Sequence, residues 1–291
     1  MSLSFTVGNT PLVRLQRMGA NLLGKAEYLN PTGSVKDRAG AQMLKAGIES
    51  GALSKDKEIL DSSSGNTGIS LAAFGAAIGF RVSIVLPKSA SVERQKMLRL
   101  YGANIIYSDP LEGSDGAILI ARELSEREPE RYFYTDQYSN DANCRAHYLG
   151  TAEEVWRQTS GEITHFVAGV GTGGTIMGTG KRLKELNPKV KIIAVEPEGP
   201  IHGIEGLKHI ESSIKPKIFD ARFPDDTLFV ETEKSQAMVK RLAKEEGVFV
   251  GTSSGATVLA ALKYTEEKEN TVVAVLADQG SRYLSERYLS D

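Results

Sequence analysis

Lys36 lies at the start of a predicted helix, directly after a segment of turn-forming residues. Residues 30–33, Asn-Pro-Thr-Gly, are typical of a turn, and Ser34 is placed to cap the helix that follows. Burial and the positive end of a helix dipole both lower the pKa of a lysine, and a deprotonated lysine forms Schiff bases with carbonyl groups. Because most lysines are solvated, this spacing alone leaves Lys36 open between a nucleophile and a surface charge.

A second polar segment, Ser-Ser-Ser-Gly-Asn-Thr-Gly over residues 62–68, separates a predicted strand from a predicted helix. Backbone N–H groups at a helix N-terminus attract anions, and glycine lets the chain approach a ligand closely. One serine is enough to cap a helix. The run of hydroxyl and amide side chains therefore favours a phosphate or carboxylate site over a simple cap.

A third segment, Gly-Val-Gly-Thr-Gly-Gly-Thr over residues 169–175, again connects a strand to a helix. Its glycines match the dinucleotide pattern, and Glu196 ends the next strand near the position of a ribose-binding carboxylate. The segment alone therefore indicates NAD or another nucleotide. The hydroxyls of Thr172 and Thr175 instead suit one terminal phosphate better than a buried pyrophosphate.

These segments must be positioned by an alternation of short β-branched runs and longer helical patterns. Predicted strands cover 58–60, 81–86, 104–107, 164–168, 191–195, 227–230 and 271–276. Predicted helices between them cover 91–101, 114–127, 141–158, 174–186, 233–246 and 254–268. The rhythm indicates an α/β protein with parallel sheets covered by helices on both faces. Residues 199–226 break it with glycines and prolines, and either form a lid over the site or a surface loop.

The composition is that of an ordinary globular protein. Its 291 residues are 41% hydrophobic and 25% charged, and the net charge of −2 argues against a nucleic-acid partner. No signal peptide or membrane span is expected, and the single cysteine, Cys144, excludes an internal disulfide and fits a cytoplasmic protein. Cys144 and His147 lie three residues apart, but no metal-binding motif includes them and no metal is expected.

Taken together, the segments resemble the cysteine synthase (O-acetylserine sulfhydrylase) branch of the fold-type II, tryptophan synthase β-like, pyridoxal-phosphate enzymes. The resemblance runs from Gly-Asn-Thr-Pro-Leu at 8–12 to Arg-Tyr-Leu-Ser at 282–285. Residues 91–94 and 100–103 are closer to the B type than to the A type. Asp-Gln-Gly at 278–280 stands where many relatives carry a serine-rich turn, and this also supports the B type.

The resemblance implies a role for each site residue. Lys36 would hold pyridoxal 5'-phosphate as an internal aldimine and act as the catalytic base, Asn66 would bind the ring oxygen, and Ser253 would face the ring nitrogen. Ser253 also has a simpler interpretation as the N-cap of a helix over 254–264. The phosphate would be cradled by Gly171, Thr172, Gly173, Gly174 and Thr175. The substrate carboxylate would be held by Ser63, Ser64, Gly65, Thr67 and Gln137.

Lys208 falls near the place where B-type relatives carry a basic lid residue facing the site. A cation there would favour O-phosphoserine, thiosulfate or a thiocarboxylate as substrate. A solvated lysine is the alternative interpretation of Lys208.

The activity implied is formation of L-cysteine from O-acetyl-L-serine or O-phospho-L-serine and a sulfur donor, through an α-aminoacrylate. The donor would be sulfide, thiosulfate or the thiocarboxylate of a sulfur-carrier protein. Two alternatives stay open: cystathionine β-synthase or serine/threonine dehydratase activity on the same scaffold, and an NAD- or nucleotide-binding regulatory protein. The resemblance also implies a homodimer of chains with two three-layer αβα domains. The larger would comprise 1–35 and 141–291 and the smaller, mobile one 36–140, with the cofactor in the cleft between them.

Overall fold

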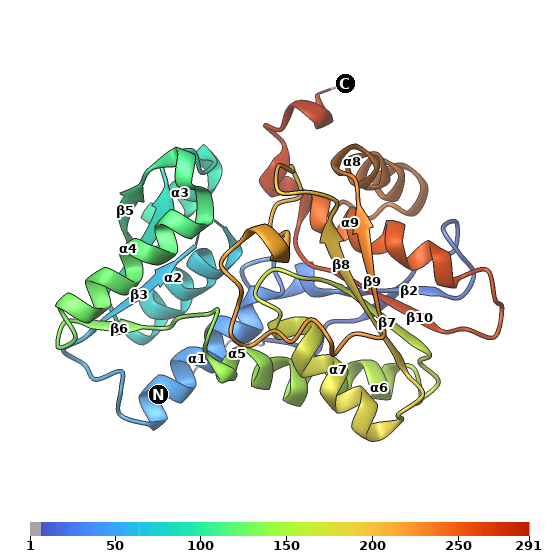
Figure 1. Ribbon diagram of the computed structural model, residues 1–291, viewed down its shortest axis with the longest axis horizontal. Coiled ribbons are helices and arrows are strands. Elements are labelled where there is room, and N and C mark those ends of the chain that lie inside the picture. The colour runs from blue at the N-terminus through green and yellow to red at the C-terminus, as the bar shows by residue number, and fades with distance from the viewer. Residues whose placement is uncertain (1–6, 64, 291) are drawn as a thin grey trace.

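The computed structural model describes residues 7–63 and 65–290, which form two lobes, each built on one β-sheet (Figure 1). The larger sheet has the strand order β1-β2-β10-β7-β8-β9, and the smaller has the order β5-β4-β3-β6. All neighbouring strands are parallel except β1, which runs antiparallel to β2. The strands are β1 (Leu12–Arg14), β2 (Leu22–Ala26), β3 (Glu58–Ser62), β4 (Val82–Pro87), β5 (Asn104–Ser108), β6 (Tyr132–Tyr134), β7 (His165–Gly169), β8 (Lys191–Pro197), β9 (Asp226–Val230) and β10 (Val272–Leu276).

Helices cover both faces of each sheet. The α-helices are α1 (Lys36–Glu49), α2 (Asn66–Ile78), α3 (Val92–Leu100), α4 (Gly113–Arg127), α5 (Asp141–Ala146), α6 (Ala152–Gln158), α7 (Gly174–Leu186), α8 (Thr232–Arg241) and α9 (Thr252–Ala261). Two π-helical turns, η3 (His147–Thr151) and η5 (Leu242–Glu246), continue α5 and α8. Short 3-10 turns are η1 (Glu27–Leu29), η2 (Pro110–Glu112), η4 (Ile210–Ser212), η6 (Leu262–Tyr264), η7 (Gly280–Tyr283) and η8 (Arg287–Leu289).

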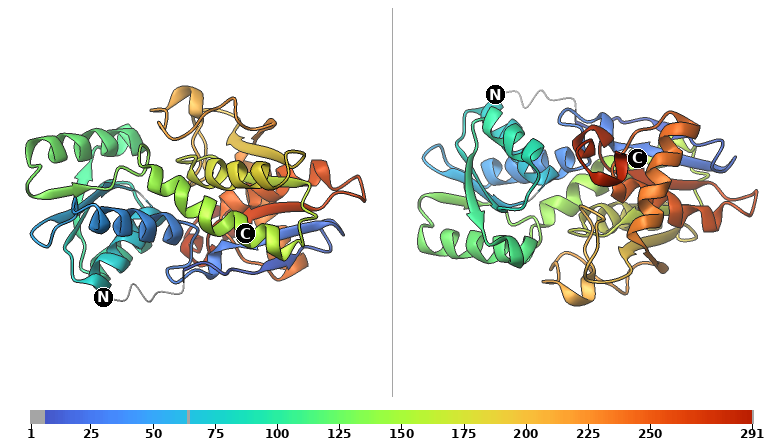
Figure 2. Two further views of the ribbon diagram at one scale, coloured as in Figure 1. Left: turned by 90° about the horizontal axis from the view of Figure 1, so that it is seen from below. Right: turned by 90° about the horizontal axis from the view of Figure 1, so that it is seen from above.

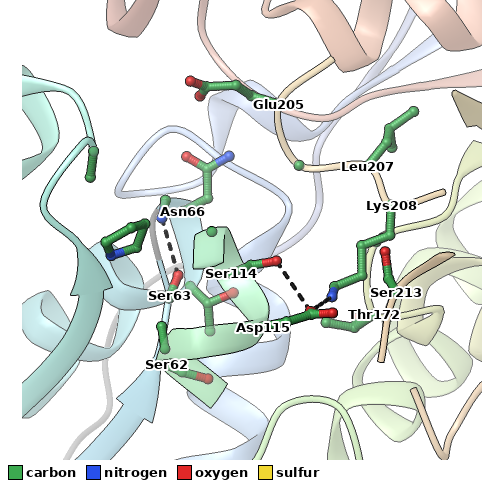
Figure 3. A pocket seen from close by; sticks show the side chains of 18 of the residues that line it. Ser62, Ser63, Asn66, Ser114, Asp115, Thr172, Glu205, Leu207, Lys208 and Ser213 are labelled. Carbon is green, nitrogen blue, oxygen red and sulfur yellow. Dashed lines mark hydrogen bonds and ion pairs between the residues drawn. The ribbon is translucent and has the colours of Figure 1, made fainter. Parts of the chain in front are cut away.

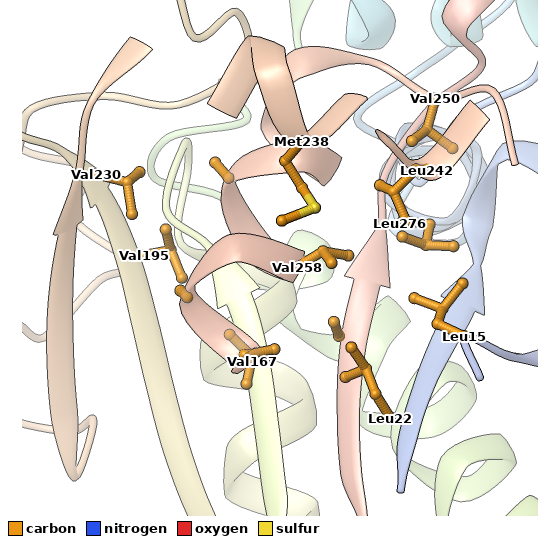
Figure 4. Close-up of a cluster of buried hydrophobic side chains, with 14 of the residues drawn as sticks. Leu15, Leu22, Val167, Val195, Val230, Met238, Leu242, Val250, Val258 and Leu276 are labelled. Carbon is orange, nitrogen blue, oxygen red and sulfur yellow. The ribbon is translucent and has the colours of Figure 1, made fainter. Parts of the chain in front are cut away.

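The larger sheet is the middle layer of three. Side chains alternate across its strands, so Val167 of β7 joins Met238 and Val258 in a cluster under α8 and α9 (Figure 4). Its neighbour Phe166 joins Ile176 in the cluster under α6 and α7 on the opposite face. The smaller sheet is covered in the same way, by α1, α2 and α3 on one face and by α4 on the other. The α/β class with helices on both faces of mostly parallel sheets is therefore confirmed.

Each of the seven predicted strands is present, with ends shifted by one or two residues. The sequence does not predict β1, β2 and β6, because β1 and β6 have only three residues and β2 contains Gly24 and the fully buried Lys25. The predicted helix over 141–158 contains the turn η3 at its centre. The predicted helix over 254–268 ends as an α-helix at Ala261.

Helices α1 and α5 pack against each other between the two lobes (Figure 2). α1 packs against α2 of the smaller lobe and against α5, which packs on α7 of the larger lobe. The boundaries at 35/36 and 140/141 therefore stay predictions, since α1 belongs to the packing of both lobes.

A buried cluster of charges joins β2 and η1 to α1 and α6. Lys25 Nζ lies 2.7 Å from Glu154 Oε2, and Arg38 bridges Glu27 and Glu154 at 2.7 Å each. Burial raises the pKa of Glu154, but the charges and hydrogen bonds of Arg38 and Lys25 outweigh burial and hold it at about 2. The cluster fixes the start of α1, where Lys36 lies, to the body of the larger lobe.

None of the helices within residues 7–63 and 65–290 combines the length and apolar character that a membrane crossing requires. The strands that precede the two polar segments, β3 and β7, end at the same cleft, since both segments line it. Ligands of open parallel sheets bind at such carboxyl ends.

Candidate active site

The predicted site residues gather around two cavities that share part of their lining, and Figure 3 shows the wider one. The wider cavity, of about 730 Å³, is lined by Lys36, Ser63, Gly65, Asn66, Thr67, Gln137, Gly171, Thr172 and Lys208 among others. A narrow cavity of about 40 Å³ shares Lys36, Asn66, Gly171 and Thr172, and adds Gly173, Thr175 and Ser253. Of the remaining predicted residues, Gly174 opens α7 but lines neither cavity, and Ser64 lies outside the described residues.

Lys36 is half-buried as the first residue of α1 and lines both cavities. Burial lowers the pKa of its ammonium group, while the charges of Asp278 and Glu27 oppose this change. The predicted cap is only partly realised. Val35 holds the N-cap position, and the Ser34 hydroxyl accepts a hydrogen bond of 3.3 Å from the Lys36 backbone N–H instead. A half-buried lysine with a lowered pKa has the properties of a Schiff-base and proton-transfer group.

The glycine segment between β7 and α7 forms a concave turn under the narrow cavity. Gly173 has a φ of +87°, in the left-handed region that glycine adopts without strain. A Cβ on Gly171 would clash with the carbonyl oxygen of Gly206, so only glycine fits there. The Thr172 hydroxyl accepts hydrogen bonds from Asn143 Nδ2 at 3.0 Å and from the Gly174 N–H at 3.3 Å. Its own proton remains available to a ligand.

The polar segment after β3 is organised by its own side chains. Ser63 Oγ accepts hydrogen bonds from the backbone N–H groups of Gly65 at 3.2 Å and Gly68 at 3.0 Å. Thr67 Oγ1 donates to Gln137 Oε1 at 2.7 Å. Two of the backbone donors predicted to bind an anion are therefore held by the Ser63 hydroxyl in this conformation.

Asp61 lies behind this segment and was not identified from the sequence. The Gln137 amide donates one hydrogen bond of 3.2 Å to Asp61 Oδ1 and another of 2.9 Å to the Ser62 carbonyl. Thr135 Oγ1 contacts Asp61 Oδ2. Complete burial raises the pKa of Asp61 to about 7, although hydrogen bonds from Thr135 and Gln137 lower it. Asp61 fixes the Gln137 amide so that its oxygen faces Thr67.

Asn66 is held from both ends of its amide by residues near the C-terminus. Its Nδ2 donates a hydrogen bond of 2.7 Å to Asp278 Oδ2, and its Oδ1 accepts a hydrogen bond from Arg282 Nη1. Tyr283 donates its hydroxyl to the same Asp278 oxygen at 2.7 Å. Asp278, noted from the sequence as a departure from relatives, is fully buried and therefore fixes the orientation of the Asn66 amide.

Two interpretations made from the sequence are corrected by the surroundings of Ser253 and Glu196. Ser253 does not cap α9, because the helix begins at Thr252 with Gly251 at the N-cap, so Ser253 lies in its first turn. Glu196 does not reach the glycine segment. It accepts a hydrogen bond of 3.1 Å from the Ile210 N–H and lines neither cavity, so it gives a nucleotide ribose no partner there.

Lys208 is buried rather than solvated, with only 7% of its surface exposed. Its Nζ lies 2.5 Å from Asp115 Oδ1 of α4 and 5.2 Å from the centre of the Tyr138 ring. The interpretation of Lys208 as a solvated lysine is therefore wrong. Residue 208 belongs to the irregular segment 199–226, and its side chain lines the wider cavity where it pairs with Asp115 of the smaller lobe (Figure 3).

A second ion pair connects the same segment to the smaller lobe. Glu205 pairs with the buried Arg94 of α3, whose guanidinium also lies 5.3 Å from the centre of the Tyr283 ring. The segment 199–226 thus contributes one residue of each sign to contacts between the lobes. Residues of the segment also line the wider cavity, so it is not a surface loop remote from the site.

Comparisons with known proteins agree with this arrangement. A family model described as "Pyridoxal-phosphate dependent enzyme" matches residues 3–278. The cysteine synthase of Aquifex aeolicus is 49% identical over 297 aligned positions, covering 98% of this chain and 91% of the relative. The chain belongs to the pyridoxal-phosphate dependent enzymes of the cysteine synthase family.

Further relatives support the same assignment. Cysteine synthase B of Pseudomonas aeruginosa is 42% identical to this chain, with 96% of this chain and 94% of the relative covered. The solved structure of cysteine synthase (OASS) from Entamoeba histolytica superposes with a TM-score of 0.92 at 37% identity, over 98% of this chain and 89% of the other. The predicted family, the fold-type II architecture and the pyridoxal-phosphate cofactor are thereby confirmed.

The residues around the narrow cavity fit the cofactor of this family. Its described lining contains the Thr172 and Thr175 hydroxyls and no carboxylate, as a phosphate dianion requires. Gly171 leaves room where any Cβ would clash, and Lys36 lies in the same lining. Among the described residues, no group of three or more His, Cys, Asp and Glu side chains is arranged to hold a metal ion.

Proposed function

We propose that this cysteine synthase replaces the β-substituent of O-acetyl-L-serine or O-phospho-L-serine with sulfur, and that Lys36 moves the protons. The observation that carries the proposal is the position of Lys36. Its half-buried ammonium group, with a lowered pKa, lines both the narrow cavity with phosphate-binding character and the wider cavity with the polar segment.

The proposed cofactor contacts are those that the family resemblance implies, and all of these residues except Gly174 line one or both cavities. Lys36 would be the covalent attachment point, Asn66 Nδ2 would bind the ring oxygen, and the Ser253 hydroxyl would face the ring nitrogen. The phosphate would be held by Gly171, Thr172, Gly173, Gly174 and Thr175. When bound, pyridoxal phosphate withdraws electrons from the substrate Cα. A hydroxyl at Ser253 does not hold the ring nitrogen protonated as a carboxylate would, and this favours loss of a β-substituent over transamination.

The chain's own groups perform the remaining steps. The substrate carboxylate displaces the Ser63 hydroxyl from the Gly65 N–H and the Gln137 oxygen from Thr67. The Ser63 hydroxyl, the Gly65 N–H, Thr67 and Gln137 then hold the carboxylate, and Ser64 completes this set in the resemblance. Lys36 Nζ, once free, removes the Cα proton as general base and returns it after sulfur adds to Cβ. Closure of the lid excludes water during this interval.

The charge balance of the wider cavity supports the acetyl ester as the leaving group. Its cations other than Lys36 are Lys208 and Arg94, and each is paired with a carboxylate, Asp115 or Glu205. A phosphate ester would have to compete with those carboxylates for the cations. A neutral acetyl group requires no such exchange.

The test of the activity is a visible absorption spectrum of the protein loaded with pyridoxal phosphate. O-acetyl-L-serine is expected to shift the band of the lysine-linked cofactor, and sulfide is expected to restore it with release of cysteine. Lys36→Ala is expected to lose the band. A cofactor-loaded protein that converts the ester to pyruvate in water, or to cystathionine with homocysteine, better than to cysteine would replace this proposal by the dehydratase or cystathionine β-synthase alternative.

The test of the leaving group compares kcat/KM for the two esters. Asp115→Asn frees Lys208, so we expect it to raise the use of O-phospho-L-serine relative to O-acetyl-L-serine by about tenfold, the factor that 1.4 kcal/mol supplies. Lys208→Met is expected to leave the acetyl ester preferred, and Lys217→Met, an exposed lysine of the same segment, is the control. A wild-type preference for the phosphate ester would refute the charge argument.

We also infer a homodimer, a cytoplasmic location, and a sulfur-carrier thiocarboxylate as the alternative donor to free sulfide or thiosulfate. These inferences are supported by the family resemblance. Light scattering of the holoenzyme is expected to give twice the mass of one chain, and a monomeric mass with full activity would contradict the dimer.

A further inference from the structure

The segment formed by α5 and the π-helical turn η3 packs directly on the start of α7, beneath the glycine segment. The approach is close because α7 carries glycine at two positions one turn apart. A Cβ on Gly174 would clash with Asn143 Oδ1, and a Cβ on Gly178 would clash with the carbonyl oxygen of Cys144. π-Helical turns are rare and are frequently found at functional sites. Asn143 of α5 and His147 of this turn lie within reach of the two threonines of the narrow cavity.

Two side chains of the segment make those contacts. Asn143 Nδ2 donates to Thr172 Oγ1 at 3.0 Å, and His147 Nε2 lies 3.3 Å from Thr175 Oγ1. The other ring nitrogen of His147, Nδ1, lies 2.9 Å from Thr151 Oγ1 at the end of the same turn. Asn143 and His147 are buried, with 2% and 1% of their surface exposed, so their polar atoms bond to protein groups rather than to bulk water.

Each of the two contacts leaves the hydroxyl proton of its threonine free for a ligand in the cavity. Because Thr172 Oγ1 accepts from Asn143, its single proton is free to point into the cavity. His147 is neutral, since burial and the nearby charge of Arg38 lower its pKa to about 3, so only one of its ring nitrogens carries a proton. Within residues 7–63 and 65–290, the Thr151 hydroxyl has no hydrogen-bond partner other than His147 Nδ1, so Thr151 donates to Nδ1. The ring proton then lies on Nε2 and is donated to Thr175. The Thr175 hydroxyl proton is then also free to point into the cavity.

We propose that His147 is a positioning residue for the cofactor phosphate: its Nε2–H tautomer, fixed by Thr151, donates to Thr175 and directs the Thr175 hydroxyl proton at the phosphate. This inference rests on the proposed phosphate site at residues 171–175. The opposite tautomer would accept the Thr175 proton and remove one donor from the cradle. Thr151, His147 and Thr175 thus form one hydrogen-bonded chain with a single direction.

Paired ligands and paired variants test this inference. The full-length protein, stripped of cofactor, is titrated with pyridoxal phosphate and with pyridoxal, which lacks the phosphate but also reacts with Lys36. His147→Asn places an amide only near the Nδ1 position, whereas His147→Gln places an amide donor near the Nε2 position. We expect His147→Asn to weaken pyridoxal phosphate about tenfold, as for one lost hydrogen bond, and pyridoxal less than twofold. His147→Gln is expected to restore most of the loss.

A second measurement does not depend on a variant at His147. The ¹⁵N chemical shifts of the wild-type holoenzyme are expected to report the Nε2–H tautomer, and Thr151→Val is expected to give a mixture of tautomers with weakened pyridoxal phosphate binding. An Nδ1–H tautomer in the wild type, or an equal loss for both ligands in His147→Asn, would overturn the inference. A wild-type protein that binds neither ligand would instead refute the proposed function.

Discussion

Asp61→Asn is expected to change how the stability of the protein depends on pH. The side chain of Asp61 is completely buried, and its pKa of about 7 means that the folded protein keeps the proton of this carboxyl up to near neutral pH. A protonated Asp61 Oδ2 donates to Thr135, whose hydroxyl then donates to the Leu60 carbonyl, 3.5 Å away. An asparagine at position 61 donates to Thr135 in the same way, so it imitates the protonated form at every pH.

The magnitude follows from the difference between the folded and unfolded states. The unfolded chain releases the proton at the ordinary aspartate pKa of 3.8, whereas the folded chain releases it at about 7. Between these values the folded state binds more protons, so the free energy of unfolding falls as the pH rises and the loss is complete above pH 7. At 1.36 kcal/mol for each factor of ten in proton affinity, the loss is about 4 kcal/mol.

The assay is urea unfolding of the wild type and Asp61→Asn between pH 4 and pH 8. The variant is expected to match the wild type near pH 4 and to exceed it by a margin that grows toward about 4 kcal/mol at pH 8. Asp56→Asn, at an exposed position of the same lobe, is the matched control and is expected to run parallel to the wild type. A constant difference between Asp61→Asn and the wild type across this range would show that Asp61 titrates normally in the folded protein.

Two further predictions concern packing and buried charge. Lys25→Met removes a cation from the buried charged cluster and is expected to lower the free energy of unfolding by about 3 kcal/mol. Its control, Lys45→Met at an exposed ion pair, is expected to change the free energy of unfolding by less than about 0.5 kcal/mol. Equal effects of the two substitutions in urea unfolding would contradict the argument. Gly171→Ala meets the Gly206 carbonyl and is expected to cost about 1–3 kcal/mol in the cofactor-free protein. Gly199→Ala, which meets no atom within 4 Å, is its control, and differential scanning calorimetry compares them.

The sequence predicts a site residue where its type and its position relative to a helix or strand are enough to indicate its role. Lys36, after a turn and at a helix start, lines both cavities, and Gly171 and Gly173 after β7 line the narrow one. Regular buried strands are predicted for a similar reason, since a run such as Val-Ser-Ile-Val-Leu is apolar enough to be recognised. β2 is missed because its buried Lys25 is satisfied by Glu154, a partner that is distant in sequence.

The residues that were missed owe their roles to contacts across the fold. Asp61 contacts Gln137, and Asp278 contacts Asn66, each over more than 70 positions of sequence. One local signal was present for His147: it lies four residues after Asn143, on the helix face that meets the glycines of α7. A pair of polar residues at that spacing, opposite a pair of small residues, is a pattern that can be sought in other sequences.

The lid carries a consequence for how this scaffold can acquire new substrates. Glu205 and Lys208 lie three residues apart in one irregular segment, and each is paired with a residue of opposite charge on the smaller lobe. The same short stretch therefore lines the wider cavity, where we propose that the leaving group lies, and ties the two lobes together. A substitution that adapts the stretch to another ester also alters how readily the lobes separate, so selectivity and the rate of product release change together. Variants with new selectivity should thus require a compensating change at Arg94 or Asp115 to recover turnover.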